Sequence, residues 1–508
     1  MDFNANSPAR ARPRGTAVAA VAGWLALAAY ALFLSLHVGA VAGASDSSGY
    51  WNHARLLDSG RVHVAERALP GLPPAGVPPF LYVPLGFRPV GSDGAMVATY
   101  PTGLALSFVA LKTVAGWRQA GNLSMILHAV AGLVATFALC RATGLGRAWS
   151  ALGTAIVGLS PLYVFMSLQA MSDIPSLAWT TAAVLAALRS RSHAGWALAA
   201  GAALAVDVLL RPTNVLAFVP VALALGFSPR RGWLLALGGL PGAVFLCLYN
   251  RAAYGSLLTT GYGDTSRDFL AAYVPGTLLH YALWLPVLFS PIALFLFRLP
   301  WAAEVPPRTR WLLAAWIVVY AAFYTCYRCT HETWWYLRFL LPAAPAMVAA
   351  SLLGARSLAL RLQPRLGVGA TRAVAALVLG ISALTLFAAS RRLYPYGVGQ
   401  DEIRYRNVAE WVEAHVPEGA ACLCMQSSGA LFYYTQHPIL RWDFIDAPTT
   451  ARLTGAIQRT GTPVYAVLFP FEIEAGHVFD RRLPGRWTQV ADVNSVLIFR
   501  REPSPPGG

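Results

Sequence analysis

Residues 16–46 read TAVAAVAGWLALAAYALFLSLHVGAVAGASD, an apolar run over 16–38 that closely precedes the acidic residue Asp46. A spanning helix needs roughly 20 apolar residues, so this run predicts a membrane span. It follows basic residues and lacks a clean small-residue cleavage site, so we predict a retained anchor and not a cleavable signal peptide. A carboxylate next to a span is costly, and Asp46 is therefore a candidate functional residue.

The same apolar character continues to about residue 390. The chain of 508 residues is 56% hydrophobic and 12% charged, with a mean hydropathy of +0.51. Counting the apolar runs predicts about eleven spans. They cover 16–38, 121–140, 147–166, 174–188, 193–210, 213–228, 232–249, 277–297, 311–327, 336–355 and 373–389.

Arginines orient these spans. Nearly all the positive charge is arginine, because Lys112 is the only lysine. Most loop arginines fall in alternate connections, the pattern of cytoplasmic loops, so the net charge of +16 indicates membrane orientation and not a nucleic-acid partner. The predicted cytoplasmic set is Arg10, Arg12, Arg14, Arg141, Arg147, Arg189, Arg191, Arg230, Arg231, Arg298, Arg308, Arg310, Arg356, Arg361, Arg365 and Arg372.

Acidic residues divide the chain. Only eleven of the 23 acidic residues precede residue 390, which predicts a membrane domain followed by a polar domain. We predict a multi-span α-helical membrane protein with a small C-terminal extracytoplasmic α/β domain. Its parts are a cytoplasmic tail (1–15), a transmembrane domain (16–390) with a long outer loop (45–120), a soluble domain (391–502) and a disordered tail (503–508).

The two polar regions carry their own patterns. In the outer loop, 47–58 predicts a short helix and 104–117 a helix lying in the membrane interface, with a true span as the alternative. In the C-terminal region, the alternation predicts three to five strands. Strands are predicted at 420–425, 463–469 and 495–500, and helices at 403–415, 449–459 and 472–482.

Asp46 begins the stretch Asp46-Ser-Ser-Gly-Tyr50-Trp-Asn-His53. One interpretation is a helix cap, because aspartate favours that position. The other uses spacing: Asp46, Tyr50 and His53 fall on one helical face and can line one cavity. A carboxylate there can take a proton from an incoming hydroxyl.

Asp173 is the second acidic candidate on the predicted outer face. Pro175 follows it closely, so a simple helix cap is again the alternative. Outer-face arginines include Arg211 and Arg338, and arginine binds phosphate through two hydrogen bonds. Arg338 is the better candidate because it lies at the start of an apolar run, although lipid headgroups can also hold such arginines. Asp207 lies inside a span, four residues before Arg211, and predicts an internal ion pair.

The stretch from Cys326 to Tyr336 is polar and aromatic. Arg328, His331 and Glu332 are further candidates for substrate binding. The sequence leaves three alternatives for Cys326 and Cys329. They are free thiols, they form a disulfide, or they bind a divalent metal together with the nearby His331 and Glu332. The adjacent Trp-Trp-Tyr is either an interfacial aromatic belt or a platform for a sugar ring.

Several of these motifs together resemble one family. Four motifs resemble those of the protein O-mannosyltransferase and aminoarabinose transferase superfamily, both in their order along the chain and in the side of the membrane on which they are predicted to lie. They are Asp46–Gly60, Tyr100-Pro-Thr-Gly, Ser160-Pro with Ser172-Asp173, and Arg338-Phe-Leu-Leu-Pro. These are polytopic lipid-donor glycosyltransferases of the GT-C type. The resemblance covers about 45–355. Two positions depart from the family pattern. The mannosyltransferases carry a pair of acidic residues where this chain has Asp46-Ser47, and the lipid A transferases carry a lysine near the position of Tyr100, where this chain has none.

The resemblance implies an inverting transferase that takes a sugar from a polyprenyl-phosphate donor. Asp46 would be the general base and Asp173 would help to position the base or acceptor. Arg338 and Arg211 would bind the donor phosphate, and Tyr100 would line the cavity. The acceptor would be a hydroxyl on a lipid, glycan or protein at the outer face of a bacterial cytoplasmic membrane. No cofactor is required by the motifs, and a divalent metal stays an open alternative.

Three other functions fit a membrane chain. A transporter or flippase of lipid-linked glycans predicts inverted repeats or broken helices at mid-membrane, and we find no repeat in the sequence. A surface-glycan ligase would place its chemistry in a late outer loop, whereas the largest loop here is the first. A binding protein would use the α/β tail to recruit partners.

Overall fold

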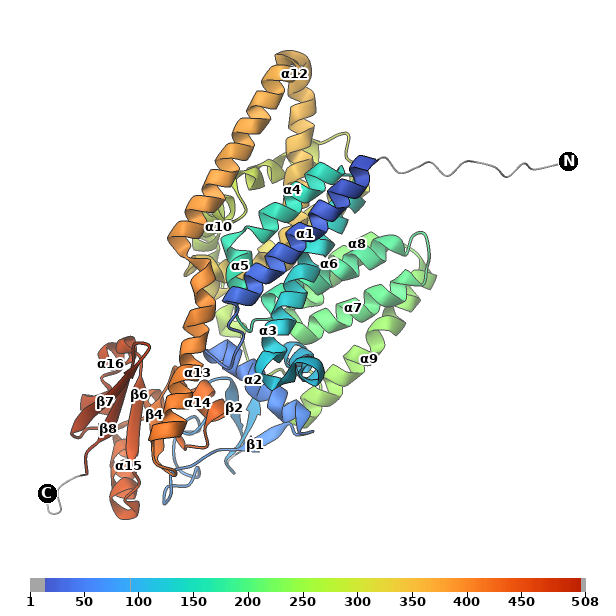
Figure 1. Cartoon of the computed structure of the whole chain (residues 1–508). Coiled ribbons are helices and arrows are strands. Elements are labelled where there is room, and N and C mark those ends of the chain that lie inside the picture. Colours follow the sequence, from blue (N-terminus) through green and yellow to red (C-terminus); the bar gives the residue numbers. More distant parts are fainter. Residues whose placement is uncertain (1–13, 92, 504–508) are drawn as a thin grey trace.

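The computed structural model describes residues 14–91 and 93–503. Most of the predicted cytoplasmic tail (1–15) and of the predicted disordered tail (503–508) lies outside the described residues. The first 390 residues are mainly helical (Figure 1). The helices of this part are α1 (Arg14–His37), α2 (Ser45–Asp58), α3 (Thr102–Ala142), α4 (Arg147–Gly158), α5 (Pro161–Ser167), α6 (Asp173–Arg189), α7 (Trp196–Leu210), α8 (Phe218–Leu225), α9 (Pro229–Tyr254), α10 (Val274–Leu288), α11 (Pro307–Thr325) and α12 (Ala344–Leu393).

The helices make this a multi-pass membrane protein. Within the described residues, five helical stretches are long and apolar enough to cross a membrane, and a sixth is possible if the bent pair α4–α5 is one span. Other apolar helices, such as α7, are shorter. The predicted count of about eleven spans is therefore not confirmed and stays a prediction.

Small residues let the membrane helices approach closely. A Cβ atom added at Gly201 of α7 would lie 2.0 Å from the carbonyl oxygen of Leu235 on α9. Helices inside a bilayer gain little from the hydrophobic effect and associate instead through such close packing. Other glycines contribute in the same way, since Gly132 of α3 faces Tyr163 of α5.

Besides the bent pair α4–α5, which divides the predicted span 147–166, three helical stretches are interrupted. In α3 the backbone breaks at Gly116, so a first helix from Thr102 precedes the predicted span 121–140. In α12 the break at Gly367, with φ of 79°, lets the chain turn back on itself, as Figure 1 shows at the end opposite α2.

The third interruption corrects a prediction. The predicted single span 277–297 consists of two elements, α10 and the 3₁₀ helix η4 (Pro291–Trp301). They are separated at Ser290, whose φ is 65°. Hydropathy does not detect this change, but Pro291 marks it, because proline favours the first turn of a new helix.

The outer loop forms a small sheet that was not predicted from the sequence. Strands β1 (His63–Ala65), β2 (Phe87–Val90) and β3 (Ala95–Ala98) pair antiparallel in the order β1-β3-β2. The predicted helix 47–58 is present as α2.

The C-terminal region folds around a five-stranded mixed sheet of order β5-β4-β6-β8-β7. The predicted strands and the helices at 403–415 and 449–459 are present, whereas β5, β7 and α14 were not predicted, and the predicted helix 472–482 is split in two. The elements are α13 (Val398–His415), β4 (Ala421–Cys424), α14 (Ser428–Tyr434), β5 (Ile439–Arg441), α15 (Ala447–Thr460), β6 (Val464–Leu468), α16 (Pro470–Gly476), a π-helical turn (Val478–Arg482), β7 (Trp487–Val493) and β8 (Val496–Arg501).

This C-terminal unit is built together with the outer loop. One of its hydrophobic cores combines Leu69, Leu81 and Tyr82 of the loop with Leu423 and Leu440 of the sheet. The backbone N–H of Arg441 also donates to the carbonyl oxygen of Leu81, over 2.8 Å. Figure 1 shows the unit beside α2 and β1, at the end of the molecule opposite the turn in α12.

Candidate active site

Asp46 lies in the first turn of α2, and its carboxylate accepts hydrogen bonds from two side chains. Its Oδ2 accepts a hydrogen bond from Nη2 of Arg338 at 3.1 Å, and its Oδ1 accepts one from the hydroxyl of Tyr100. The Ser45 hydroxyl lies 3.2 Å from the Tyr100 oxygen. The Asp46 side chain is 28% exposed, so its carboxylate is reachable from outside the protein.

Asp173 forms a second, more deeply buried pair. It lies in the first turn of α6, and its Oδ1 accepts a hydrogen bond from Nη2 of Arg211 at 2.7 Å. The Asp173 side chain is 1% exposed, and Arg211 ends α7. A buried charge is stable only when it is paired, so each side chain requires the other.

The two ion pairs share neighbours. The guanidinium carbons of Arg211 and Arg338 lie 5.4 and 5.3 Å from the centre of the Phe339 ring. Tyr50 of α2 is buried, lies 5.1 Å from Tyr100 between ring centres, and lies close to the side chain of Ser172, beside Asp173. The structure therefore brings six predicted residues together: Asp46, Tyr50, Tyr100, Asp173, Arg211 and Arg338.

Local backbone features place these side chains. Arg338 lies in the 3₁₀ helix η6 (Trp334–Ala343), which runs directly into α12. Gly103 lets the start of α3 approach the end of α7, because a Cβ there would lie 2.5 Å from the backbone nitrogen of Leu210. This close contact brings Tyr100 near the helix end that carries Arg211.

His53 departs from the prediction that it shares a cavity with Asp46. It is fully buried, and its Nε2 lies 2.8 Å from the hydroxyl of Tyr249 on α9. Burial lowers the pKa of His53 to about 4, so the ring is neutral at physiological pH. The spacing of seven positions from Asp46 to His53 corresponds to about 10 Å along a helix, which is too far for both to contact one small group.

Three candidates at 328–332 are also not brought to the ion pairs. Arg328 is 58% exposed and pairs with Asp268 over 3.6 Å. The His331 ring lies 5.7 Å from that of Tyr273, and Glu332 is exposed. Cys326 and Cys329 are free thiols, and among the described residues no group of three or more His, Cys, Asp and Glu side chains is arranged to hold a metal.

Two further tyrosines, which were not predicted from the sequence, lie near the ion pairs. Tyr262 packs edge-on against Tyr100, with ring centres 6.2 Å apart, and Tyr324 stacks on Phe339 at 4.9 Å. The Tyr324 hydroxyl also lies 2.7 Å from that of Thr213. The only sequence signal for Tyr262 is its position between two glycines, Gly261 and Gly263, in an outer connection.

Asp207 does not form the predicted ion pair with Arg211, because Arg211 is paired with Asp173. Its two carboxylate oxygens instead accept hydrogen bonds from Thr180 at 2.5 Å and from Asn214 at 2.7 Å. Asp207 is fully buried and joins α6, α7 and the turn that follows Arg211. Its role is therefore to fix the helix end that positions Arg211.

We expect Asp207→Ala to lower the free energy of unfolding by about 2–3 kcal/mol, because two buried donors lose their acceptor. Thermal unfolding of the detergent-solubilised protein measures this loss. Asp268→Ala is the matched control, since its partner Arg328 is exposed, and we expect it to change stability by less than about 1 kcal/mol. Equal melting temperatures for both variants would contradict this role.

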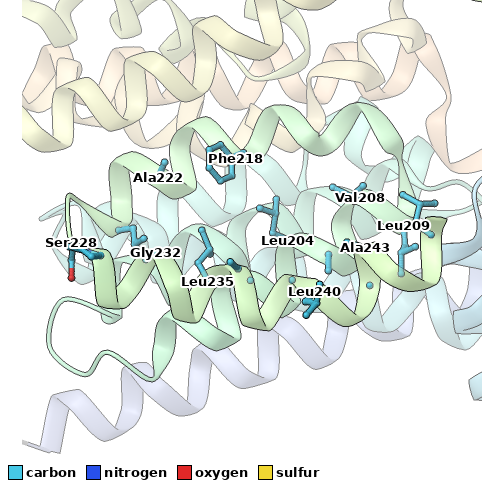
Figure 2. Close-up of a pocket in the computed structure, with 18 of the residues that line it drawn as sticks. Leu204, Val208, Leu209, Phe218, Ala222, Ser228, Gly232, Leu235, Leu240 and Ala243 are labelled. Carbon is cyan, nitrogen blue, oxygen red and sulfur yellow. The ribbon is translucent and has the colours of Figure 1, made fainter. Parts of the chain in front are cut away.

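An apolar groove lies next to this site. Its volume is about 850 Å³, and α7, α8 and α9 line it almost entirely with apolar side chains. Figure 2 shows Leu209 at one end and Ser228 at the other. Leu209 is two residues from Arg211, so one end of the groove lies at the end of α7 that Arg211 follows, and the groove extends from there toward Ser228.

Comparisons with known proteins agree with this architecture. No protein-family model matches the sequence, and a comparison with curated proteins found no match. Among solved structures, ArnT from Cupriavidus metallidurans bound to undecaprenyl phosphate aligns with a TM-score of 0.56 and 14% identity, over 96% of this chain and 98% of ArnT. The chain has the GT-C fold.

Other solved structures with this GT-C fold give the same result. The apo state of ArnT aligns with a TM-score of 0.55 and 13% identity, over 96% of this chain and 98% of ArnT. An Archaeoglobus fulgidus oligosaccharyltransferase tethered with an acceptor peptide aligns with a TM-score of 0.50 and 12% identity, over 88% of this chain and 69% of its own. The predicted GT-C fold is thus confirmed.

Proposed function

We propose that this chain transfers a sugar from a polyprenyl-phosphate donor to an acceptor hydroxyl, with inversion at the anomeric carbon. The observation that carries the proposal is the pairing of Asp46 with Arg338 at 3.1 Å, beside the Asp173–Arg211 pair at 2.7 Å. One site thereby combines a reachable carboxylate with two arginines. A carboxylate can accept a proton from a hydroxyl, and arginines can bind a phosphate.

In the proposed reaction, the donor phosphate binds Arg338 and competes with Asp46 for its hydrogen bonds. Asp46 is then free to accept the proton of the acceptor hydroxyl. The hydroxyl oxygen forms a bond to the anomeric carbon while the bond from that carbon to the phosphate oxygen breaks. The phosphate leaves with the electron pair, and arginine stabilises its growing negative charge.

Asp173 and Arg211 have a supporting role in this proposal. Arg211 is 12% exposed, and its ion pair with Asp173 fixes the position of its guanidinium group beside Arg338. Asp173 keeps that group in place from the start of α6. Buried Tyr50 packs against Tyr100, and the partly exposed ring of Tyr100 is the one on which a sugar ring can stack.

The apolar groove suits the isoprenoid tail of such a donor. A polyprenyl chain is wholly apolar, and so is nearly all of the lining by α7, α8 and α9. Because the groove begins two residues from Arg211, a chain lying in it would hold its phosphate close to the arginines. The ArnT structure with undecaprenyl phosphate makes a polyprenyl phosphate the natural first ligand to test.

The decisive experiment supplies purified protein with undecaprenyl-phosphate-linked sugars and with lipid, glycan and protein acceptors, all extracted from bacterial membranes. We expect release of undecaprenyl phosphate, measured by mass spectrometry, and a product of opposite anomeric configuration, measured by NMR. Retained configuration would contradict the inverting mechanism. Movement of intact lipid-linked sugar across vesicles without release would favour a flippase instead.

The proposed location is the outer face of a bacterial cytoplasmic membrane. The loop arginines predict that the C-terminal unit lies outside. We expect an alkaline phosphatase fused after residue 395 to be active and a green fluorescent protein fused there to be dark. The same reporters fused in the predicted cytoplasmic connection at Arg230 serve as the control, and a fluorescent fusion after residue 395 would contradict the orientation.

A further inference from the structure

Glu402 is a buried carboxyl group of α13 that contacts the segment leading into α2. Its Oε2 accepts a hydrogen bond from the backbone N–H of Ala44 at 3.2 Å, across 358 residues of chain. The Ser47 side chain lies close to the same carboxyl group. Glu402 is only 5% exposed, so these groups replace water as its partners.

This contact completes the start of α2. Ala44 is the residue before the helix and has no side chain that can cap it. In a capping box, a glutamate three residues further on accepts the N–H of the residue before the helix, but that position is Ser47 here. Glu402 supplies the missing acceptor from another part of the chain.

The surrounding contacts are close and come from the same unit. A Cβ added at Gly43 would lie 2.0 Å from Oε2 of Glu402, so any larger residue there would push the Glu402 carboxyl group away from its present position. From α14, the Tyr434 hydroxyl accepts the N–H of Ala42 at 3.3 Å, and the Gly429 carbonyl accepts from the Asn52 side chain at 2.9 Å. The C-terminal unit thus holds α2 on both sides of Asp46.

We propose that Glu402 is a positioning residue that fixes the first turn of α2 and thereby holds the Asp46 carboxylate beside Arg338. This inference rests on the proposed function, in which Asp46 is the general base. In this proposal the C-terminal unit contributes to the reaction, because α13 and α14 orient the base without contacting the substrate.

The same contact depends on pH. Burial raises the pKa of Glu402 to about 7, and the titratable and charged groups facing it are Asp46 of α2 together with Asp401 and Tyr405 of α13. Because burial raises this pKa, the buried position of Glu402 against the start of α2 is more stable when the carboxyl group is neutral than when it is ionised. This stabilisation is complete at pH values below the ordinary glutamate pKa and is lost as the pH rises through about 7.

Hydrogen–deuterium exchange of the full-length protein in nanodiscs tests the positioning directly. In the wild type we expect the amides of residues 44–50 to lose protection between pH 6 and pH 8, after correction for the intrinsic exchange rate. Glu402→Gln should keep its protection at both pH values, because the amide oxygen accepts the Ala44 hydrogen bond without titrating. Glu402→Ala should lose about fivefold in protection at pH 6, the usual effect of a lost cap.

Two further variants control this experiment. Glu472→Gln changes another buried glutamate of the C-terminal unit, which accepts from the backbone of Phe469 and the indole of Trp442 and not from α2. We expect it to keep the wild-type pH dependence at residues 44–50. Gly43→Ala displaces the Glu402 carboxyl from the opposite side and should reproduce the loss seen in Glu402→Ala.

Turnover of the extracted lipid-linked sugars separates the two proposals. We expect Glu402→Ala to lower the rate about fivefold or more while Glu472→Gln keeps it. Wild-type protection of residues 44–50 in Glu402→Ala would overturn the positioning role, whatever the rate. Lost protection with an unchanged rate would support the contact with α2 and overturn Asp46 as the base that it serves.

Discussion

Asp46→Asn should reduce sugar transfer by about 10²- to 10⁴-fold, the usual contribution of a general base. An amide cannot accept the proton of the acceptor hydroxyl, whereas its oxygen can still accept the hydrogen bond from Tyr100. The fold should therefore be unchanged. The rate is measured as undecaprenyl phosphate released from extracted lipid-linked sugars, and folding by size-exclusion chromatography and thermal unfolding.

Asp58→Asn is the matched control for this variant. Asp58 ends the same helix and pairs with Lys112 at a half-exposed position, away from the arginines of the site. Both variants remove one carboxylate from α2, so a general effect of charge on the helix would lower both rates. We expect Asp58→Asn to retain most of the activity, and wild-type turnover in Asp46→Asn would exclude Asp46 as the base.

The sequence could predict which acidic residues share a site because the bilayer restricts where charge is placed. Asp46 and Asp173 each follow an apolar run, and the alternating arginines assign both to one face. The sequence could not predict which arginine pairs with which carboxylate. Arg211 lies four residues from Asp207 yet pairs with Asp173 on another helix, because the packing of α6 against α7 decides the partner.

Helical spacing explains one success and one failure. Tyr50, one turn after Asp46, reaches the site, whereas His53, a further turn along, meets Tyr249 of α9. Both lie on the predicted face, but a face alone does not tell how far along the helix the site extends. Glu402 gave no sequence signal, because its role depends on a contact across 358 residues.

Arg338→Gln should weaken binding of undecaprenyl phosphate by about 10- to 100-fold, which corresponds to losing a charge-assisted hydrogen bond. Arg338→Lys should recover only part of the affinity, because lysine keeps the charge but not the planar pair of donors. Binding is measured by the change in intrinsic tryptophan fluorescence in nanodiscs. Arg328→Gln is the control, since Arg328 is 58% exposed and pairs with Asp268, and we expect it to bind as the wild type does.

The comparison with Asp46→Asn makes this prediction more specific. If phosphate and Asp46 compete for Arg338, removing the carboxylate should strengthen undecaprenyl phosphate binding while it abolishes transfer. The Asp46 and Arg338 variants would then change affinity in opposite directions although both reduce turnover. Weaker binding in both would mean that the ion pair only maintains the structure of the site, and unchanged binding in Arg338→Gln would place the phosphate elsewhere.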